Sequence, residues 1–208
     1  MNQKRLRYTL IGEGFAEYEF IPKYLEWAAS TFAENVQISQ TKVQLPISKN
    51  PSVSKILTGA GMMCAQTFAD KKDPCDLCII GIDLDQPDHT DDLDYHKAKI
   101  DELTDKMGKV YRVYENRIIV YVPIQVIDCC TSYLQQRVTA NSLELKTKEV
   151  TKKIVYGESR PDRQRIVQVV KSAVANADFD ELAKQSRSFR HFHEQVMSFF
   201  ENLPLNSS

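Results

Sequence analysis

Two sets of acidic residues follow apolar segments of the sequence, and their side chains suit a divalent cation. The run 6–11 leads to Glu13, and the run 79–82 leads to Asp83 and Asp85. Both runs contain Ile or Leu in the pattern that is typical of buried parallel strands. Ligands bind at the carboxyl edge of a parallel sheet, so we expect the three carboxylates to converge there. Oxygen donors of this kind favour Mg²⁺ or Mn²⁺ as the cofactor.

The turn that carries Glu13 is flanked by Gly12 and Gly14. Glycine permits a sharp turn and a close approach of the backbone, so the start of the following helix could lie near a phosphate or a metal ion. A dinucleotide-binding fingerprint is excluded, because the position that requires its third glycine is Glu17.

Further polar residues could complete such a site. Glu17 and Asp88 are candidate ligands of a second ion, or groups that support the first ligands. Asp128 follows another predicted strand and has the same candidate role, although a helix N-cap is an equally good interpretation. Candidate substrate-binding residues are His89, Lys146, Lys148, Lys152 and Arg190. For any one of the lysines or Arg190, an exposed amphipathic helix is the simpler explanation.

The order of strand and helix patterns indicates which elements would position these groups. The expected strands are 6–11, 36–45, the run before Asp83, and 117–122. The expected helices start near Glu17, Pro51 and Tyr95 and then cover 127–138, 145–155, 163–177 and 189–203. This order predicts an α/β fold, a Rossmann-like core with a mostly parallel central sheet flanked by helices. We expect the core to span 1–126 and a mainly helical extension, 127–208, to pack on it.

Composition sets the broad class of protein. The chain has 208 residues, of which 42% are hydrophobic and 26% charged, values that exclude wholesale disorder. The net charge of -1 gives no general attraction to nucleic acid, but basic residues cluster at 146–153 and 160–165. We see no membrane span and no secretory leader, so we expect a cytoplasmic protein with reduced cysteines.

The acidic motifs resemble those of the Toprim domain. The resemblance rests on Gly12-Glu13-Gly14 followed by Glu17 and Phe20-Ile21, and on Asp83-Leu84-Asp85 after an Ile-rich strand. Toprim proteins include type II and IA topoisomerases, bacterial primases, recombination-repair proteins and the overcoming-lysogenization-defect nucleases. In the arrangement of its motifs, the chain most resembles small stand-alone Toprim-like proteins. Several of these are encoded beside ATPases in bacterial anti-phage systems. The Toprim core would cover 6–126, and a weaker resemblance extends over 123–128, 145–153 and 186–192.

This resemblance implies a Mg²⁺-dependent nuclease that hydrolyses phosphodiester bonds in DNA or RNA. Glu13, Asp83 and Asp85 would be its metal ligands and catalytic residues, with Glu13 also a candidate general acid or base. The resemblance further implies a partner ATPase or sensor protein in a multi-component antiviral defence system. Strand passage and primer synthesis need further domains, so the size of the chain argues against a topoisomerase or primase. A homodimer is compatible with cleavage of both strands of a duplex.

Two other functions stay open. The first is a non-catalytic Toprim-like scaffold that binds nucleic acid or a partner protein. The second is another α/β phosphoryl-transfer protein, either phosphatase-like or receiver-like. A phosphatase of the D-x-D type normally carries that motif after the first strand, where this chain has Glu13. A receiver domain requires an acidic pair at the same place.

Overall fold

A four-stranded parallel sheet forms the centre of the protein. The computed structural model describes residues 4–33, 35–41, 51–125, 127–135 and 143–203. The strands are β1 (Lys4–Ile11), β2 (Val36–Gln40), β3 (Leu77–Gly81) and β4 (Ile118–Tyr121), in the spatial order β2-β1-β3-β4. All three pairings are parallel. The prediction of an α/β fold with a parallel central sheet flanked by helices is therefore confirmed.

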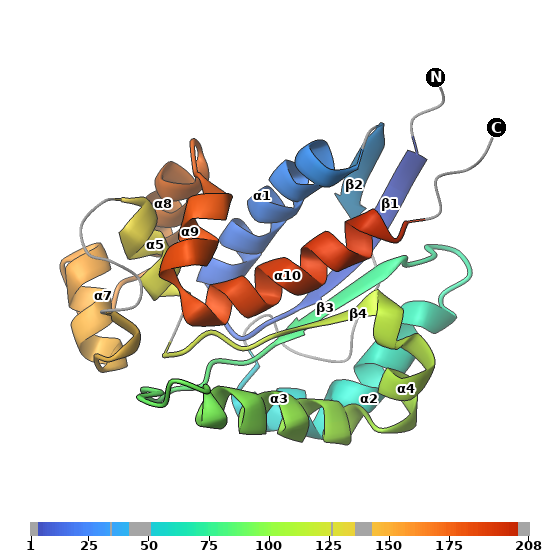
Figure 1. Ribbon diagram of the computed structural model, residues 1–208, viewed down its shortest axis with the longest axis horizontal. Coiled ribbons are helices and arrows are strands. Elements are labelled where there is room, and N and C mark those ends of the chain that lie inside the picture. Colours follow the sequence, from blue (N-terminus) through green and yellow to red (C-terminus); the bar gives the residue numbers. More distant parts are fainter. Residues whose placement is uncertain (1–3, 34, 42–50, 126, 136–142, 204–208) are drawn as a thin grey trace.

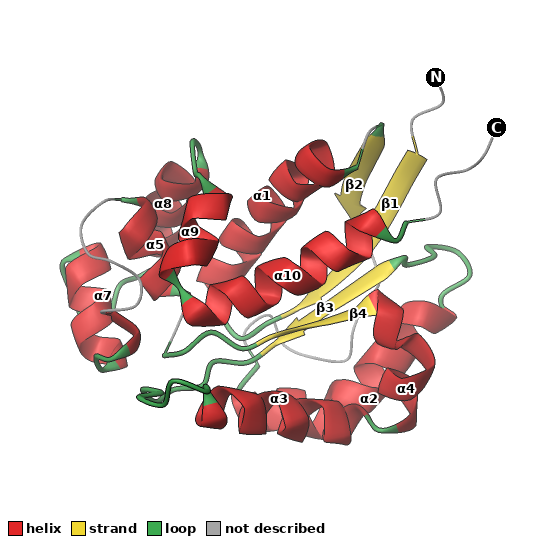
Figure 2. Ribbon diagram, viewed as in Figure 1, coloured by secondary structure: helices red, strands yellow, loops and turns green. Residues whose placement is uncertain are grey.

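Helices cover both faces of this sheet (Figures 1 and 2). One face carries α1 (Phe15–Phe32) and α10 (Arg187–Glu201), and the other carries α2 (Val53–Ala69), α3 (Asp94–Met107) and α4 (Lys109–Tyr114). Side chains of a strand alternate between its faces, so neighbouring residues of β3 enter different cores. Leu77 and Ile79 pack towards α1, whereas Cys78 and Ile80 pack towards α2. Burial on both sides explains the continuous apolar character of this strand.

The remaining helices gather beyond the carboxyl ends of the strands, at the left of Figure 1. They are α5 (Asp128–Leu134), α7 (Lys148–Tyr156), α8 (Arg163–Val174) and α9 (Phe179–Gln185). An aromatic cluster joins α9 to the helices that cover the sheet: the ring centroid of Phe20 on α1 lies 5.7 Å from that of Phe179 on α9 and 5.8 Å from that of Phe189 on α10. The boundary expected at 126 stays a prediction, but one hydrophobic core includes residues from both sides of it.

Several helices differ from the expected ranges because of their end residues. The first helix starts at Phe15, so Pro22 lies inside it and not in its first turns. Neither α4 nor α9 was predicted. Gly108, at a φ of 56°, separates α4 from α3, and the Asp178 side chain accepts a hydrogen bond from the Glu181 N–H at the start of α9. These capping interactions define short helices that periodicity does not reveal.

Two predicted elements lie partly outside the described residues. The expected strand 36–45 is observed as β2 over 36–40, and the expected helix 127–138 as α5. Residues 42–45 and 136–138 are not among those that the structure describes.

Candidate active site

The strand order places a topological switch point beside the first acidic turn. After β1 the chain passes to the face covered by α1, whereas after β3 it passes to the opposite face, covered by α3. These adjacent strands are paired through Ile11 and Ile80 near their carboxyl ends. In open α/β sheets, ligands bind where neighbouring connections diverge in this way. Glu13 and Asp83 follow the two strands that define this point.

The structure brings Glu13, Asp83 and Asp85 together. Glu13 Oε1 accepts a hydrogen bond of 2.5 Å from the Asp83 backbone N–H. Asp83 is 6% exposed, whereas Asp85 is exposed and has a φ of 58°. This left-handed conformation is uncommon for a residue other than glycine and lies just after the buried aspartate. The D-x-D segment therefore presents one buried and one exposed carboxylate beside Glu13.

Lys148 binds both aspartates from the first turn of α7. Its Nζ atom lies 3.2 Å from Asp83 Oδ2 and 2.6 Å from Asp85 Oδ1. Burial opposes the charged ammonium, but the two carboxylates outweigh this and raise the pKa of Lys148. A single cationic group thus bridges the two acids of the motif.

Further acids lie buried behind this surface. Glu17 is 4% exposed, and burial, reinforced by the charges of Asp128 and Glu13, raises its pKa to about 7. Burial and the charge of Glu17 also raise the pKa of Asp83 well above its usual value. The pKa of Glu13 is raised mainly by burial, with the charge of Asp85 adding to the effect. Each shift indicates that the group lacks full compensation of its negative charge.

Asp128 belongs to this buried group and is not a helix N-cap. Residue 127 occupies the N-cap of α5, and Asp128 is the first helical residue. The Asp128 carboxylate accepts a hydrogen bond from the hydroxyl of Tyr156, at the end of α7. Burial raises the pKa of Asp128, opposed by this hydrogen bond and by the charge of Lys152. Tyr156 therefore links α7 to the acids behind the site, a role that the sequence did not suggest.

Asp88 has its hydrogen bonds within its own loop. Its Oδ1 accepts from the N–H and the hydroxyl of Thr90, and its Oδ2 accepts from the His96 N–H at the start of α3. Burial opposes ionisation of Asp88, but these hydrogen bonds lower its pKa. Both oxygens are thus engaged in shaping the loop, which gives no support to the hypothesis that Asp88 is a metal ligand.

The predicted cations differ in their positions. Lys148 contacts the acids directly, and Lys152 influences Asp128. Arg190 instead donates to the carbonyls of Ala183 and Lys184 at the end of α9, so it stabilises that helix end. His89 and Lys146 are exposed, and no hydrogen bond or ion pair found among the described residues joins them to the acids.

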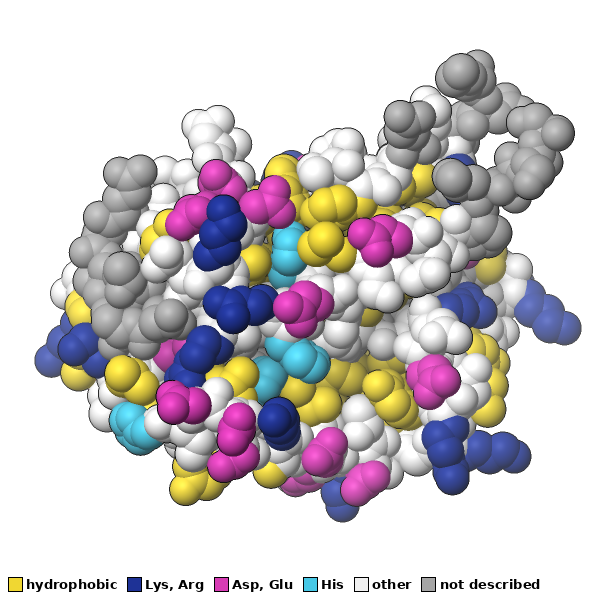
Figure 3. All heavy atoms as spheres, viewed as in Figure 1, with side chains coloured by type: hydrophobic (Ala, Val, Ile, Leu, Met, Phe, Trp, Pro, Cys, Tyr) yellow, Lys and Arg dark blue, Asp and Glu magenta, His cyan; other side chains and the backbone are white. Residues whose placement is uncertain are grey.

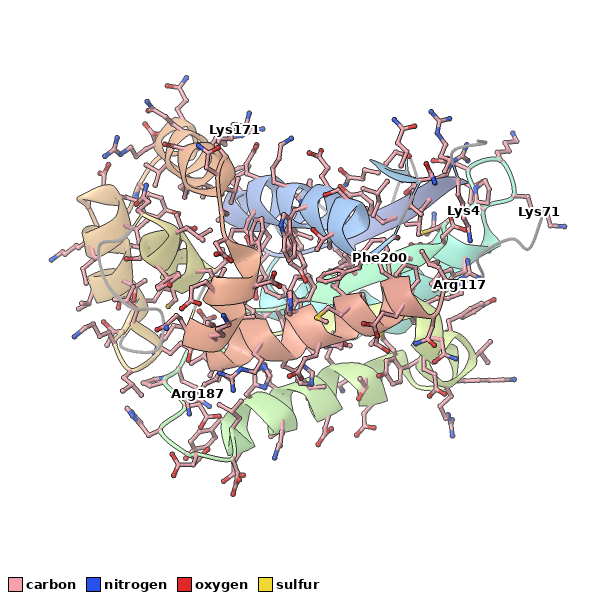
Figure 4. The ribbon with its side chains drawn as sticks, turned by 45° about the horizontal axis from the view of Figure 1, so that its top comes forward. Lys4, Lys71, Arg117, Lys171, Arg187 and Phe200 are labelled. Atoms are coloured by element: carbon pink, nitrogen blue, oxygen red, sulfur yellow. The ribbon has the colours of Figure 1, made fainter. Side chains whose placement is uncertain are left out.

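Arg187 supports the site from the opposite end of the chain. Its guanidinium donates to the carbonyl oxygens of Asp88, at 2.6 Å, and Thr90, at 2.8 Å. Figure 4 shows Arg187 at the start of α10, close to the loop that precedes α3. Its Nε atom also lies 3.5 Å from the buried Glu144. The sequence places this arginine in the segment 186–192, directly after Ser186, which caps the helix, and gives no sign of its partner.

The donor chemistry of the acids fits a hard divalent cation. The Asp83 Oδ1 atom is buried and has no hydrogen-bond partner among the described residues. The neighbouring Oδ2 atom already binds a cation, the ammonium of Lys148. Within the described part of the chain, no three Asp, Glu, His or Cys side chains are yet arranged around one point as a ligand set. Metal binding would therefore require these side chains to rearrange.

Comparisons of the chain with protein-family models, with curated proteins and with solved structures gave no match. None of the described helices is long and apolar enough to span a membrane.

Proposed function

We propose that this protein is a Toprim-type nuclease that hydrolyses phosphodiester bonds in nucleic acid with Mg²⁺ or Mn²⁺. The observation that supports the proposal is the meeting of Glu13, Asp83 and Asp85 beyond the carboxyl ends of β1 and β3. Carboxylates at such a sheet edge are suited to phosphoryl chemistry when a divalent ion neutralises the reacting phosphate.

Glu13, Asp83 and Asp85 would hold the ion, with Glu17 behind them. The bound ion would polarise a phosphoryl oxygen and activate a water molecule. Burial raises the pKa of Glu13 in the metal-free site, and a bound cation would lower this pKa and keep the carboxylate ionised as a ligand. Glu17, with a pKa of about 7, can hold or release a proton close to the reaction. Lys148 supplies positive charge beside the same carboxylates.

The polymer would be DNA or RNA, bound through basic side chains near the acids. Lys148 and Lys152 lie on α7, and the Arg163 guanidinium lies 4.7 Å from the ring of Phe15, which follows the acidic turn. Figure 3 shows Lys and Arg side chains interspersed with Asp and Glu on the left half of the face in view. Such mixed charge favours local phosphate contacts over a broad electrostatic attraction. A partner ATPase or sensor, a defence role and a cytoplasmic location belong to the same proposal by resemblance.

A non-catalytic scaffold is the second candidate function. The observation that favours it is the ion pair of Lys148 with Asp83 and Asp85, which already neutralises part of the acidic charge. In that case the acids would stabilise the fold, and nucleic acid or a partner would bind without being cleaved. A receiver-like or phosphatase-like protein would capture a phosphate analogue, such as aluminium fluoride, on an aspartate. Neither the nuclease nor the scaffold should do so.

The test is a cleavage assay on plasmid and on single-stranded DNA and RNA with Mg²⁺ or Mn²⁺. We expect Glu13→Gln and Asp83→Asn to lose at least about a hundredfold in rate, because each removes a charged ligand. Asp101→Asn, an exposed substitution on α3, is the matched control and should cleave like the wild type. Circular dichroism checks that all variants fold.

Two results would refute the nuclease. Equal nicking by the wild type and both site variants would place the activity elsewhere. Nucleic-acid binding without cleavage, unchanged by the substitutions or by EDTA, would instead identify the scaffold.

A further inference from the structure

Lys148 holds the oxygens that a metal ion would need. Its ammonium lies 2.6 Å from Asp85 Oδ1 and 3.2 Å from Asp83 Oδ2, so it bridges the two aspartates of the D-x-D segment. Asp83 is almost fully buried, and the Lys148 side chain is 33% exposed. An ion pair in this partly enclosed position is screened less by solvent than one on the open surface.

A divalent ion bound by both aspartates cannot share them with the ammonium in this position. Both cations would occupy the space between the same two carboxylates, and their charges would repel each other at short distance. Binding of the ion therefore requires that the Lys148 ammonium withdraw from at least one aspartate. The free energy needed to break the existing ion pair therefore weakens the net binding of the metal ion.

The placement of Lys148 on α7 allows this withdrawal. The lysine is the first residue of the helix, whereas the opposite end is anchored by Val155 and Tyr156, which pack against Val169. The Tyr156 hydroxyl also donates a hydrogen bond to the buried Asp128 carboxylate. The ammonium lies at the end of a flexible, partly exposed side chain, so it can turn outward while α7 stays in place.

We propose that Lys148 is an internal competitor of the divalent ion, and that it sets the metal affinity of the site. In the metal-free protein it neutralises Asp83 and Asp85, and it weakens the binding of the ion that displaces it. This inference rests on the proposed function, since it assumes that the two aspartates are metal ligands.

The experiment is calorimetric titration of the metal-free, full-length protein with Mn²⁺, without nucleic acid. Lys148→Met removes the charge and keeps an unbranched side chain that is one atom shorter, and we expect it to bind Mn²⁺ about tenfold more tightly than the wild type. Lys148→Arg keeps the charge and should bind within about threefold of the wild type. Lys153→Met removes an exposed charge from the same helix and should leave the affinity unchanged.

Thermal unfolding gives a second readout that needs no activity. In EDTA, Lys148→Met should melt below the wild type, because it leaves two acids without their ammonium partner. Saturating Mn²⁺ should then raise its melting temperature more than that of the wild type.

The outcomes separate this inference from the proposed function. Equal or weaker Mn²⁺ binding by Lys148→Met, with measurable binding by the wild type, overturns the competition and leaves the metal site standing. If neither protein binds Mn²⁺, both the competition and the metal-dependent nuclease are wrong.

Discussion

The acidic residues of the site carry more negative charge than their surroundings compensate. Glu13, Glu17 and Asp83 all have raised pKa values, and in each case burial is the largest cause. Keeping such groups ionised costs folding energy unless a cation neutralises them. This cost is expected of a site that is completed by a ligand and is hard to explain by fold stability alone.

The raised pKa of Glu17 predicts a pH dependence of stability. Its pKa is about 7 in the folded protein and near 4.5 when exposed, so the folded state binds more protons between these values. Stability from this group is therefore complete below about pH 4.5 and is lost as the pH rises towards 7. In EDTA, the unfolding free energy of the wild type minus that of Glu17→Gln should fall by about 2 to 3 kcal/mol between pH 5 and 8.

Urea unfolding of both proteins at each pH measures this difference. The subtraction removes the contribution of the other titrating groups, provided that they behave alike in the two proteins. A difference that stays constant, or that grows with pH, would show that Glu17 is not buried with a raised pKa.

The sequence revealed the acids of the site better than their partners. Glu13, Asp83 and Asp85 could be proposed because each follows an apolar run, which is a local pattern. The bond of Lys148 to Asp85 spans 63 positions, and Arg187 reaches Asp88 across 99. Such contacts depend on how distant helices pack, which local periodicity does not encode. Asp88 is the opposite case. It lies near the motif in the sequence, but its carboxylate oxygens accept hydrogen bonds from Thr90 and His96, which are close to it along the chain.

At the level of elements, β3 positions the D-x-D segment through an unusually close contact with β4. Gly81, the last residue of β3, is paired with Tyr121. A Cβ atom at residue 81 would lie 2.5 Å from the carbonyl oxygen of Tyr121 and would also strike its ring. Glycine is therefore required for β3 to approach β4 two residues before Asp83.

Gly81→Ala should destabilise the protein by about 2 kcal/mol or more, because backbone atoms of β4 must move to admit the methyl group. Gly59→Ala is the matched control, since its Cβ would meet the flexible end of Met63 at 3.4 Å inside α2. Alanine favours a helix, so the control should be neutral or slightly stabilising. Chemical denaturation compares the two, and an equal effect would mean that the contact at residue 81 is not tight.

The elements were predictable to different degrees. Apolar runs identified β1, β3 and β4, because parallel strands are buried on both faces. The order β2-β1-β3-β4 was not predictable, since it depends on which face each connection crosses. That order is what places the switch point of the sheet beside Glu13 and Asp83. Short helices such as α9 were missed because their limits are set by single capping side chains.

On the scale of the whole molecule, the C-terminal helices complete the core that holds the site. The last helix, α10, covers the same face of the sheet as α1. The ring centroid of its Phe192 lies 5.0 Å from that of Tyr121 on β4. At its start, Arg187 fixes the loop after the D-x-D segment. Residues from both ends of the chain are thus needed to shape one site. We therefore expect metal binding to change the side-chain positions of Glu13, Asp83 and Lys148 together.

X-ray diffraction from crystals soaked in Mn²⁺ tests the central claim most directly, because the anomalous signal locates the ion without any assay of activity. We predict a peak between the carboxylates of Glu13, Asp83 and Asp85, with the Lys148 ammonium displaced from the aspartates. The peak should be absent in Asp83→Asn crystals. Full occupancy of Mn²⁺ elsewhere, with Lys148 still bridging Asp83 and Asp85, would contradict the metal site and the function proposed for it.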